Sequence, residues 1–143
     1  MLDIDEFKKI NDVYGHQAGD QVIARCARLL TEFSRKSDTV AHYGGEEFIT
    51  LVPRTSLSEV QSLAQRIKQE VSNTSIVLKD DSVVTFSISI SIGIGIGIGI
   101  GIGIGIAQIE KTQDHNIQDI IQRTDQALYK AKQQGRDQII THA

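Results

Sequence analysis

The sequence predicts an α+β fold in which helices pack on an antiparallel-rich central sheet. Two observations favour this class: short strand-like runs occur in adjacent pairs that suit hairpins, and amphipathic helical stretches separate those pairs. A doubly wound parallel sheet would need strands that alternate one by one with helices. At 143 residues the chain has the length of one domain, and we expect a single domain over residues 1–143.

The composition is typical of a globular protein, with 40% hydrophobic and 23% charged residues. A net charge of −3 gives no long-range attraction for nucleic acid or an anionic membrane, so we expect neither as a partner. The first residues carry no charged leader followed by an apolar stretch, which favours a cytoplasmic protein. The single cysteine, Cys26, falls among the apolar positions of a helical pattern, where we expect it to be buried.

The first half of the chain contains two helical patterns and one hairpin pattern. The expected elements are a buried strand at 1–4, a helix at 7–14, a long amphipathic helix from residue 20, and strands at 39–43 and 46–52. Gly44-Gly45, between the last two strands, can adopt the positive φ angles of a two-residue hairpin turn.

The second half begins with a clear helix start. Ser56 and Glu59 form a capping-box pattern before apolar residues that continue at helical spacing to Val71. A second hairpin is expected from strands at 75–78 and from residue 83. Asn116 is expected to cap a helix that ends at Gly135, and a last strand is expected at 138–141.

Residues 87–106 form a dipeptide repeat of three Ser-Ile pairs followed by seven Gly-Ile pairs. In a strand, this period of two places every Ile on one face, as a sheet covered by helices requires. The repeat is longer than a usual strand and specifies its register poorly, so we expect one part to fill the sheet while the rest extends or loops out. A phosphate-binding loop is disfavoured, because such loops carry irregularly spaced glycines at the start of a helix.

Two pairs of acidic residues are candidates for metal chemistry. Asp3 and Asp5 end the first strand at a spacing that directs both carboxylates to one side, and such pairs commonly hold Mg²⁺, although they could also simply end the strand and cap the next helix. Glu46 and Glu47 should face opposite sides of their strand. The string Gly44-Gly45-Glu46-Glu47-Phe48 is rare enough by chance to indicate a specific site.

Several motifs together resemble the GGDEF-domain diguanylate cyclases, over nearly the whole chain. They are Asp3-Ile4-Asp5-Glu6-Phe7-Lys8, Asn11-Asp12, Tyr14-Gly15-His16, Gly19-Asp20, Tyr43-Gly44-Gly45-Glu46-Glu47-Phe48, and Tyr129-Lys130-Ala131-Lys132 with Gly135-Arg136. The resemblance implies a ferredoxin-like sheet similar to that of nucleotide cyclases and the polymerase palm. It also implies a bacterial signal-transduction enzyme that condenses two GTP molecules into cyclic di-GMP and releases pyrophosphate, in a homodimer whose domains each bring one GTP.

The resemblance also implies metal and catalytic residues. Asp3 and Glu46 match the Mg²⁺ ligands of the family, with the Ile4 carbonyl and Glu47 assisting, and Mn²⁺ is a substitute ion. Glu46 and Glu47 are the expected catalytic residues. Magnesium prefers hard oxygen ligands, and in an in-line displacement it neutralises charge on the attacked phosphate.

Residues from three segments are expected to bind GTP. Asn11 and Asp20 match guanine-reading positions, and a carboxylate suits the N–H donors on the guanine edge that adenine lacks. The residues that match triphosphate positions are Lys8, Lys132 and Arg136, with the backbone amides of Glu6 and Phe7. On the residues alone, Asp20 could instead be a helix N-cap, and the two C-terminal cations could complement a helix dipole.

A further motif is expected to form a regulatory site. Arg35 and Asp38 lie shortly before the glycine turn, at the place of the family's inhibitory RxxD site for cyclic di-GMP, and Arg66 falls where a second domain often completes that site. Arginine can fork two bonds to phosphate and stack on a guanine plane, whereas a bare RxxD string is commonly a surface ion pair. The resemblance therefore implies product inhibition.

The chain departs from the family pattern in three respects. First, it begins inside the first strand and lacks the usual N-terminal helix. Second, its repeat is longer than the corresponding strand of the family. Third, no upstream sensory domain precedes it, and His42 stands where the family often has Arg. These departures leave two alternatives open. One is a catalytically impaired GTP- or cyclic di-GMP-binding module, and the other is a truncated reading of a longer gene.

Overall fold

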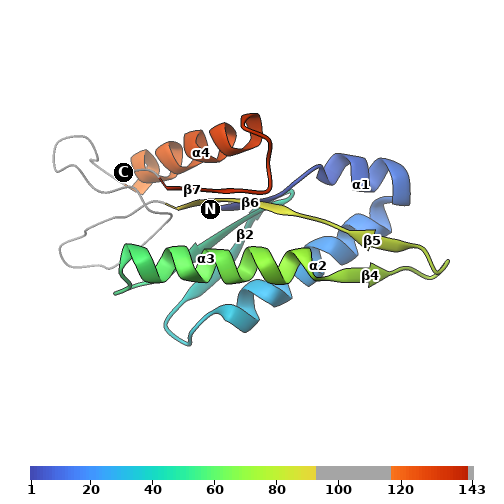
Figure 1. Cartoon of the computed structure of the whole chain (residues 1–143), viewed down its shortest axis with the longest axis horizontal. Helices are drawn as coiled ribbons and strands as arrows, with labels where there is room; N and C mark the ends of the chain where they lie inside the picture. The colour runs from blue at the N-terminus through green and yellow to red at the C-terminus, as the bar shows by residue number, and fades with distance from the viewer. Residues whose placement is uncertain (93–116, 142–143) are drawn as a thin grey trace.

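The computed structural model describes residues 1–92 and 117–141 (Figure 1). In these ranges the strands are β1 (Leu2–Ile4), β2 (Thr39–Gly44), β3 (Glu47–Leu51), β4 (Ser75–Val77), β5 (Val83–Thr85), β6 (Ile88–Ile92) and β7 (Ile139–Thr141). The helices are α1 (Phe7–Tyr14), α2 (His16–Phe33), α3 (Leu57–Ser72) and α4 (Ile117–Gln133). The central sheet has the strand order β2-β3-β1-β6-β7, and β4 and β5 form a separate hairpin.

The α+β class predicted from the sequence is confirmed. β1 pairs antiparallel with both β3 and β6, and only the β6–β7 pair of the described sheet is parallel. All three residues of β1 are buried. Asp3 lies opposite Glu47 of β3 and opposite Ser89 of β6 in the strand register, so the acidic end of β1 reaches the glycine turn from the middle of the sheet.

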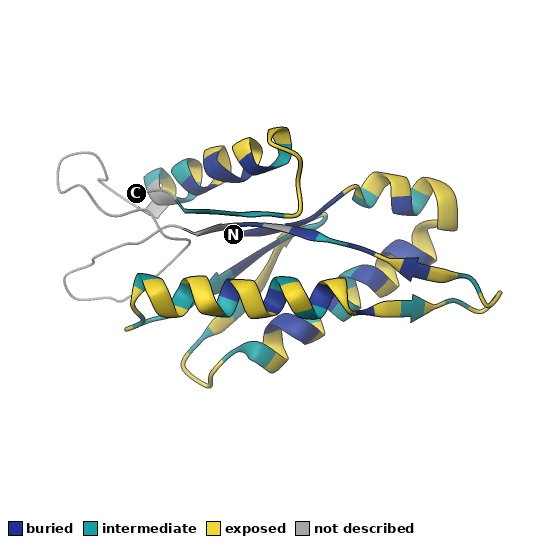
Figure 2. Ribbon diagram, in the orientation of Figure 1, coloured by how far each residue is buried: buried dark blue, intermediate teal, exposed yellow. Residues whose placement is uncertain are grey.

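The helices cover both faces of the sheet (Figure 1). The larger core lies between the sheet and α2 and α3; its fully buried side chains include Ile4, Val22, Leu29, Phe48 and Ile88. On the opposite face, Leu128 of α4 packs with Met1 and Ile49 in a smaller core. Figure 2 shows the result, with buried residues along the central strands and exposed residues on the outer faces of the helices.

The predicted β2–β3 hairpin is confirmed, but its turn lies one residue later than the predicted Gly44-Gly45 pair, because Gly44 ends β2. Gly45 has φ 53°, a left-handed backbone that favours glycine, and the ladder is irregular between His42 and Gly44. β3 begins at Glu47, so Glu46 belongs to the turn and not to the strand. The His42 ring stacks on Phe48 with centroids 5.0 Å apart, and its Nε2 lies 2.7 Å from the Gly45 carbonyl oxygen.

The second helix begins four residues earlier than predicted. Gly15, with φ 85°, ends α1 and directly precedes α2, which starts at His16. Asp20 therefore lies inside α2, and its alternative explanation as an N-cap is wrong. The expectation failed because apolar periodicity becomes clear only from Val22, whereas the helix already begins at His16, directly after the positive-φ residue Gly15.

Other predicted elements are found as expected. Ser56 and Glu59 form the reciprocal capping box of α3, with Ser56 N donating to Glu59 Oε2 over 2.8 Å. The β4–β5 hairpin and the short β7 strand are present. β6 contains the first part of the repeat; residues 93–106 and the Asn116 cap lie outside the described residues.

The remaining points concern the single cysteine and the length of the helices. Cys26 is fully buried, as predicted, and burial raises the pKa of its thiol to about 12. Among the helices in residues 1–92 and 117–141, none is long and apolar enough to cross a membrane.

Candidate active site

The acidic residues predicted to act together meet at the end of β1. Asp3 is 2% exposed and lies opposite Glu47 in the ladder. Ile4 N donates a hydrogen bond to the Glu46 carbonyl oxygen over 3.2 Å, which fixes the glycine turn against β1. The local sequence explains this placement. The short buried strand β1 carries Asp3, and in the turn of the neighbouring hairpin Gly45 is followed directly by Glu46 and Glu47.

This cluster is electrostatically strained. The pKa of Asp3 is raised from 3.8 to about 6: burial is the largest cause, the Lys132 ammonium opposes the shift, and the nearby Glu46 and Glu47 charges add to it. Lys132 Nζ lies 2.7 Å from Asp3 Oδ2. Burial also raises the pKa of Glu47, with Lys132 lowering it and Asp125 raising it. The end of β1 is therefore a concentrated negative site that one lysine partly neutralises.

The donor set at this site fits a hard divalent cation as an incomplete ligand shell. Within the described residues, no group of three or more His, Cys, Asp or Glu side chains forms a ready metal cage. Mg²⁺, however, usually binds through one or two carboxylates and completes its shell with water and substrate phosphates. Asp3 and Glu46 supply such carboxylates, and the Lys132 ammonium on Asp3 marks a position that favours a cation.

The proposed guanine-reading residues come from the two helices that follow β1. Asn11 of α1 has a buried Oδ1 with no hydrogen-bond partner among the described residues. A buried acceptor without a partner is uncommon and is often completed by a ligand or water. Asp20 of α2 is exposed, one residue after buried Gly19.

Gly19 is a residue that the sequence analysis did not assign to the site. A Cβ built at Gly19 would lie 1.9 Å from Asn11 Oδ1 and 3.0 Å from Phe7 Cζ. The absence of a side chain at Gly19 therefore leaves the space that the Asn11 amide occupies. Because the helix was predicted only from residue 20, Gly19 did not stand out as a glycine inside a helix, and its place in the Gly19-Asp20 motif was the available signal.

The three cations predicted to bind the triphosphate come from α1, α4 and the loop after α4. Lys8 is exposed in the first turn of α1, whose N-cap Glu6 has φ 52° and makes no side-chain cap, while Phe7 packs against the core. Arg136 is exposed in the loop after α4. Among the described contacts, Lys132 is the cation that reaches Asp3.

A hollow of about 420 Å³ lies along α4, next to the acidic cluster. It is lined by Asp125, Gln126, Leu128, Tyr129, Lys130, Lys132 and Gln133. Lys132 belongs both to this hollow and to the ion pair with Asp3, and the Asp125 charge acts on Glu47. Asp125 is thus a second residue near the site that sequence reasoning did not identify.

The three residues predicted to form a regulatory site share a second hollow of about 310 Å³. Arg35 and Asp38 are joined by a turn, in which Arg35 N donates to Asp38 Oδ2 over 2.7 Å. Arg66 reaches the same hollow from α3, and its guanidinium carbon lies 5.1 Å from the centre of the Phe33 ring. Arg66 is distant in sequence from the other two, and Phe33 was not predicted. The remaining lining residues are Val52, Thr55, Ser58, Glu59, Ser62 and Leu63.

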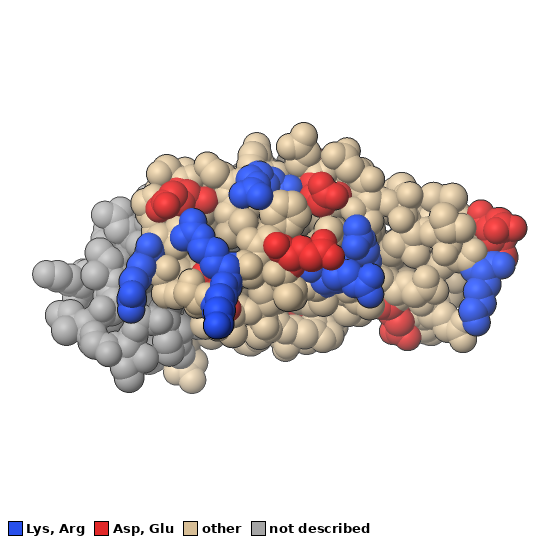
Figure 3. Space-filling view, turned by 90° about the horizontal axis from the view of Figure 1, so that it is seen from below, with Lys and Arg blue, Asp and Glu red and all other residues tan. Residues whose placement is uncertain are grey.

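Charge on the molecule is mixed. On the face seen in Figure 3, basic and acidic side chains lie beside one another without merging into one large field of a single sign. This agrees with the low net charge of −3. This face therefore shows no broad positive surface that would attract anions over a long range.

Solved structures of GGDEF domains share the fold of this chain. The GGDEF domain of DgcB from Caulobacter crescentus, solved in complex with c-di-GMP, matches with a TM-score of 0.76 and 29% identity over 98% of this chain and 74% of that one. The GGDEF domain of YfiN from Pseudomonas aeruginosa matches with a TM-score of 0.79 and 31% identity over 99% and 79%.

Sequence comparison agrees. The family model described as "Diguanylate cyclase, GGDEF domain" matches residues 1–99 and 95–138, and the chain belongs to this family. Diguanylate cyclase A of Treponema denticola is 37% identical over 140 residues, which are 97% of this chain and 33% of that protein. DgcM of Escherichia coli K12, also named a diguanylate cyclase, is 38% identical over 98% of this chain and 29% of that protein. The chain spans about a third of the length of these relatives.

Proposed function

We propose that this domain condenses two GTP molecules into cyclic di-GMP and releases pyrophosphate. The observation that carries the proposal is the cluster of Asp3, Glu46 and Glu47 at the end of β1, partly neutralised by Lys132. A buried, negatively charged strand end beside a flexible cation suits metal-assisted chemistry on a triphosphate. Family membership and the names of the relatives support the same activity.

In this proposal the residues of the chain position the nucleotide. Asn11 and Asp20 meet the guanine edge, and Lys8 and Arg136 meet the triphosphate. Lys132 exchanges its bond with Asp3 for phosphate oxygens when GTP arrives, which leaves the carboxylate for a cation. Mg²⁺ held by Asp3, Glu46 and the Ile4 carbonyl, with Glu47 assisting, would supply charge neutralisation at the α-phosphate and a lower pKa for the attacking hydroxyl.

The reaction requires two copies of the domain. The 3′-hydroxyl oxygen of each GTP attacks the α-phosphorus of the other and gives up its proton to solvent. The bond between that phosphorus and the oxygen that bridges it to the β-phosphate breaks, and pyrophosphate leaves; two such steps close the ring. Each chain offers one acidic cluster, so we propose a homodimer in which the two clusters face each other. Precise alignment of reacting atoms supplies much of the barrier reduction in such steps.

The decisive experiment is a turnover assay with purified protein, GTP and Mg²⁺. We expect one cyclic di-GMP and two pyrophosphates for every two GTP consumed. Glu46→Ala should abolish turnover, whereas Glu32→Ala, an exposed glutamate of α2, should leave it unchanged. GTP binding without any turnover by the unmodified protein would refute the enzyme proposal and favour the alternative of an impaired nucleotide-binding module.

We further propose that cyclic di-GMP binds the hollow that contains Arg35, Asp38 and Arg66 and inhibits turnover. Arg35 and Arg66 line the same hollow, and the Arg66 guanidinium lies over the Phe33 ring, an arrangement that suits a ligand with phosphates and flat purines. Arg35→Ala should lower the affinity for cyclic di-GMP by about tenfold or more while leaving initial turnover intact. Unchanged cyclic di-GMP affinity in this variant would show that the hollow is not the inhibitory site.

A further inference from the structure

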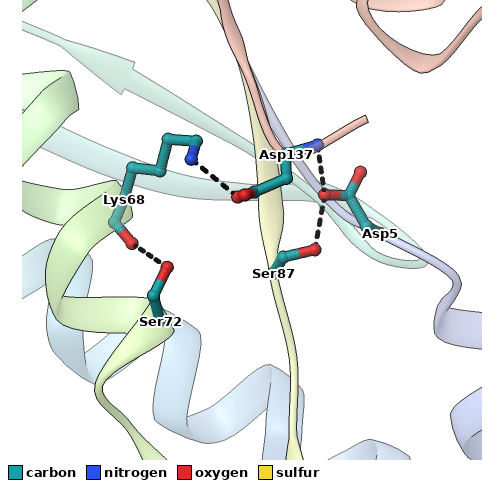
Figure 4. Close-up of polar contacts among 5 residues, drawn as sticks. All are labelled: Asp5, Lys68, Ser72, Ser87 and Asp137. Carbon is teal, nitrogen blue, oxygen red and sulfur yellow. Dashed lines mark hydrogen bonds and ion pairs between the residues drawn. The ribbon is translucent and has the colours of Figure 1, made fainter. Parts of the chain in front are cut away.

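A second buried carboxylate, two residues beyond Asp3, is bound by the loop that carries Arg136 (Figure 4). Asp5 is 5% exposed, and its Oδ2 accepts hydrogen bonds from Asp137 N over 3.0 Å and from Ser87 Oγ over 2.8 Å. Asp5 N also donates to the Ser87 carbonyl oxygen over 3.0 Å. One carboxylate oxygen therefore joins the end of β1 to the residue before β6 and to the loop after α4.

This loop has a backbone that needs such support. Gly135, Arg136 and Asp137 have φ angles of 112°, 61° and 45°. Left-handed backbone is unfavourable for arginine and less so for aspartate, and it persists where surrounding contacts over-determine it. The hydrogen bond from the Asp137 amide to a buried carboxylate is a contact of this kind, and it is stronger than a bond between neutral groups.

The loop is held from two further sides. The carboxylate of Asp137 pairs with Lys68 of α3 over 2.8 Å, and the Lys68 side chain is itself only 20% exposed. Ser72 Oγ donates to the Lys68 carbonyl oxygen on the same helix (Figure 4). Arg136 N donates to the Ala131 carbonyl oxygen at the end of α4 over 3.1 Å. The backbone of Arg136 is thus fixed on both sides, while its side chain is exposed.

We infer that Asp5 is a positioning residue for the triphosphate, which acts by holding the loop 135–137 in the form that presents Arg136 to phosphate. The inference rests on the proposed function, because it needs GTP as the ligand. In this role Asp5 acts as a hydrogen-bond acceptor for two protein donors and not as a metal ligand. The distinction matters, because an acceptor can be replaced by a neutral amide oxygen, whereas a metal ligand at this position would need its charge.

The first test compares Asp5→Ala with Asp5→Asn. The alanine variant loses the acceptor; we expect GTP, measured by calorimetry with Mg²⁺, to bind roughly ten- to a hundredfold more weakly. The asparagine variant keeps a carbonyl oxygen that can accept both donors, so it should recover most of the affinity at an unchanged Mg²⁺ requirement. If the alanine variant does not fold, Ser87→Ala, which removes one donor, replaces it and should show a smaller loss in the same direction.

The second test asks whether Asp5 acts through Arg136. In an Arg136→Ala background, Asp5→Ala should cause no further loss of GTP affinity, because the group that it positions is gone. Lys68→Met should weaken GTP binding a few-fold, whereas Lys79→Met, which removes an exposed charge at the tip of the β4–β5 hairpin, should not. Amide hydrogen exchange at Asp137, followed by NMR without GTP, should become at least about tenfold faster in Asp5→Ala.

Three results would each overturn the inference: additive effects of Asp5 and Arg136, an asparagine variant as impaired as the alanine variant, or unchanged exchange at Asp137. Failure of the proposed function gives a different pattern. An unmodified protein that binds no GTP contradicts GTP chemistry, and it removes the triphosphate role of Asp5 with it. The exchange measurement then still decides whether Asp5 holds the loop.

Discussion

Replacing Gly19 with alanine separates the stability of this protein from its nucleotide binding. An alanine normally stabilises a helix interior by about 0.5–1 kcal/mol relative to glycine. Gly19 lies within α2, so on helix propensity alone the variant should be at least as stable as the parent. Its new Cβ, however, would lie 1.9 Å from Asn11 Oδ1, far inside the separation of roughly 3.5 Å at which non-bonded atoms pack.

The side chain of Asn11 must therefore move by more than about 1 Å, since van der Waals contact begins near that separation. The atoms that must give way belong to the side chains of Asn11 and, at 3.0 Å, of Phe7, so the fold can absorb the change. If Asn11 binds guanine as proposed, its amide cannot move without cost, because the loss of its hydrogen bonds leaves buried ligand groups unpaired at a cost of about 1–3 kcal/mol. GTP should consequently bind roughly five- to 150-fold more weakly, at an unchanged or higher melting temperature.

Calorimetric titration with GTP and thermal unfolding, both on Gly19→Ala, test this prediction. The matched control is Asn11→Ala, which should weaken GTP to a similar degree. In the double variant Gly19→Ala/Asn11→Ala, the glycine substitution should add nothing. Parental GTP affinity in Gly19→Ala would refute the steric argument, as would a loss of affinity that follows a loss of stability or adds to that of Asn11→Ala.

Four further outcomes are expected. Because the pKa of Asp3 is raised from 3.8 to about 6, its ionisation destabilises the fold as pH rises through this window. In denaturant titrations without metal, Asp3→Asn should therefore gain stability over the parent between pH 4 and 7, by up to roughly 3 kcal/mol. An equal gain at pH 3 would contradict this explanation. Ser56→Ala should lose about 1 kcal/mol through the α3 cap, visible as a lower denaturation midpoint. Phe48→Ala, at a 1% exposed core position, should lose about 3–5 kcal/mol by the same measurement. Cys26 should resist thiol reagents at pH 8 until the protein is unfolded, because burial raises its pKa to about 12; rapid labelling of native protein would disprove its burial.

Most of the fold could be predicted because its signals are local. The Ser56–Glu59 capping box, the Gly44-Gly45 turn and the apolar periodicity of α3 each depend on residues a few positions apart. The start of α2 was misplaced because its first turn has no apolar stripe, and Gly15 alone marks the chain reversal. The strand order and the parallel β6–β7 pair depend on long-range packing, which no local pattern specifies.

The candidate site was predictable in its residue types but less so in its contacts. The motifs indicated Asp3, Glu46 and Lys132, and the structure brings their charges together. Local spacing could not reveal that Gly19 makes room for Asn11, because the contact crosses from one helix to the next. For the same reason, Arg66 was predicted in the hollow that it shares with Arg35 and Asp38, whereas its contact with Phe33 was not.

The hydrogen bond from the Ser87 hydroxyl to Asp5 limits how far the repetitive strand can slide along β1. Sliding the chain by one Ser-Ile pair would place Ser89 at Asp5, and sliding by two would place Ser91; a third step would put a glycine there. The apolar face is the same in every one of these frames, since the slip matches the strand period. The contact therefore permits slips of one or two pairs and disfavours longer ones, so the Ser-Ile pairs limit the register of β6 whatever number of Gly-Ile pairs follows.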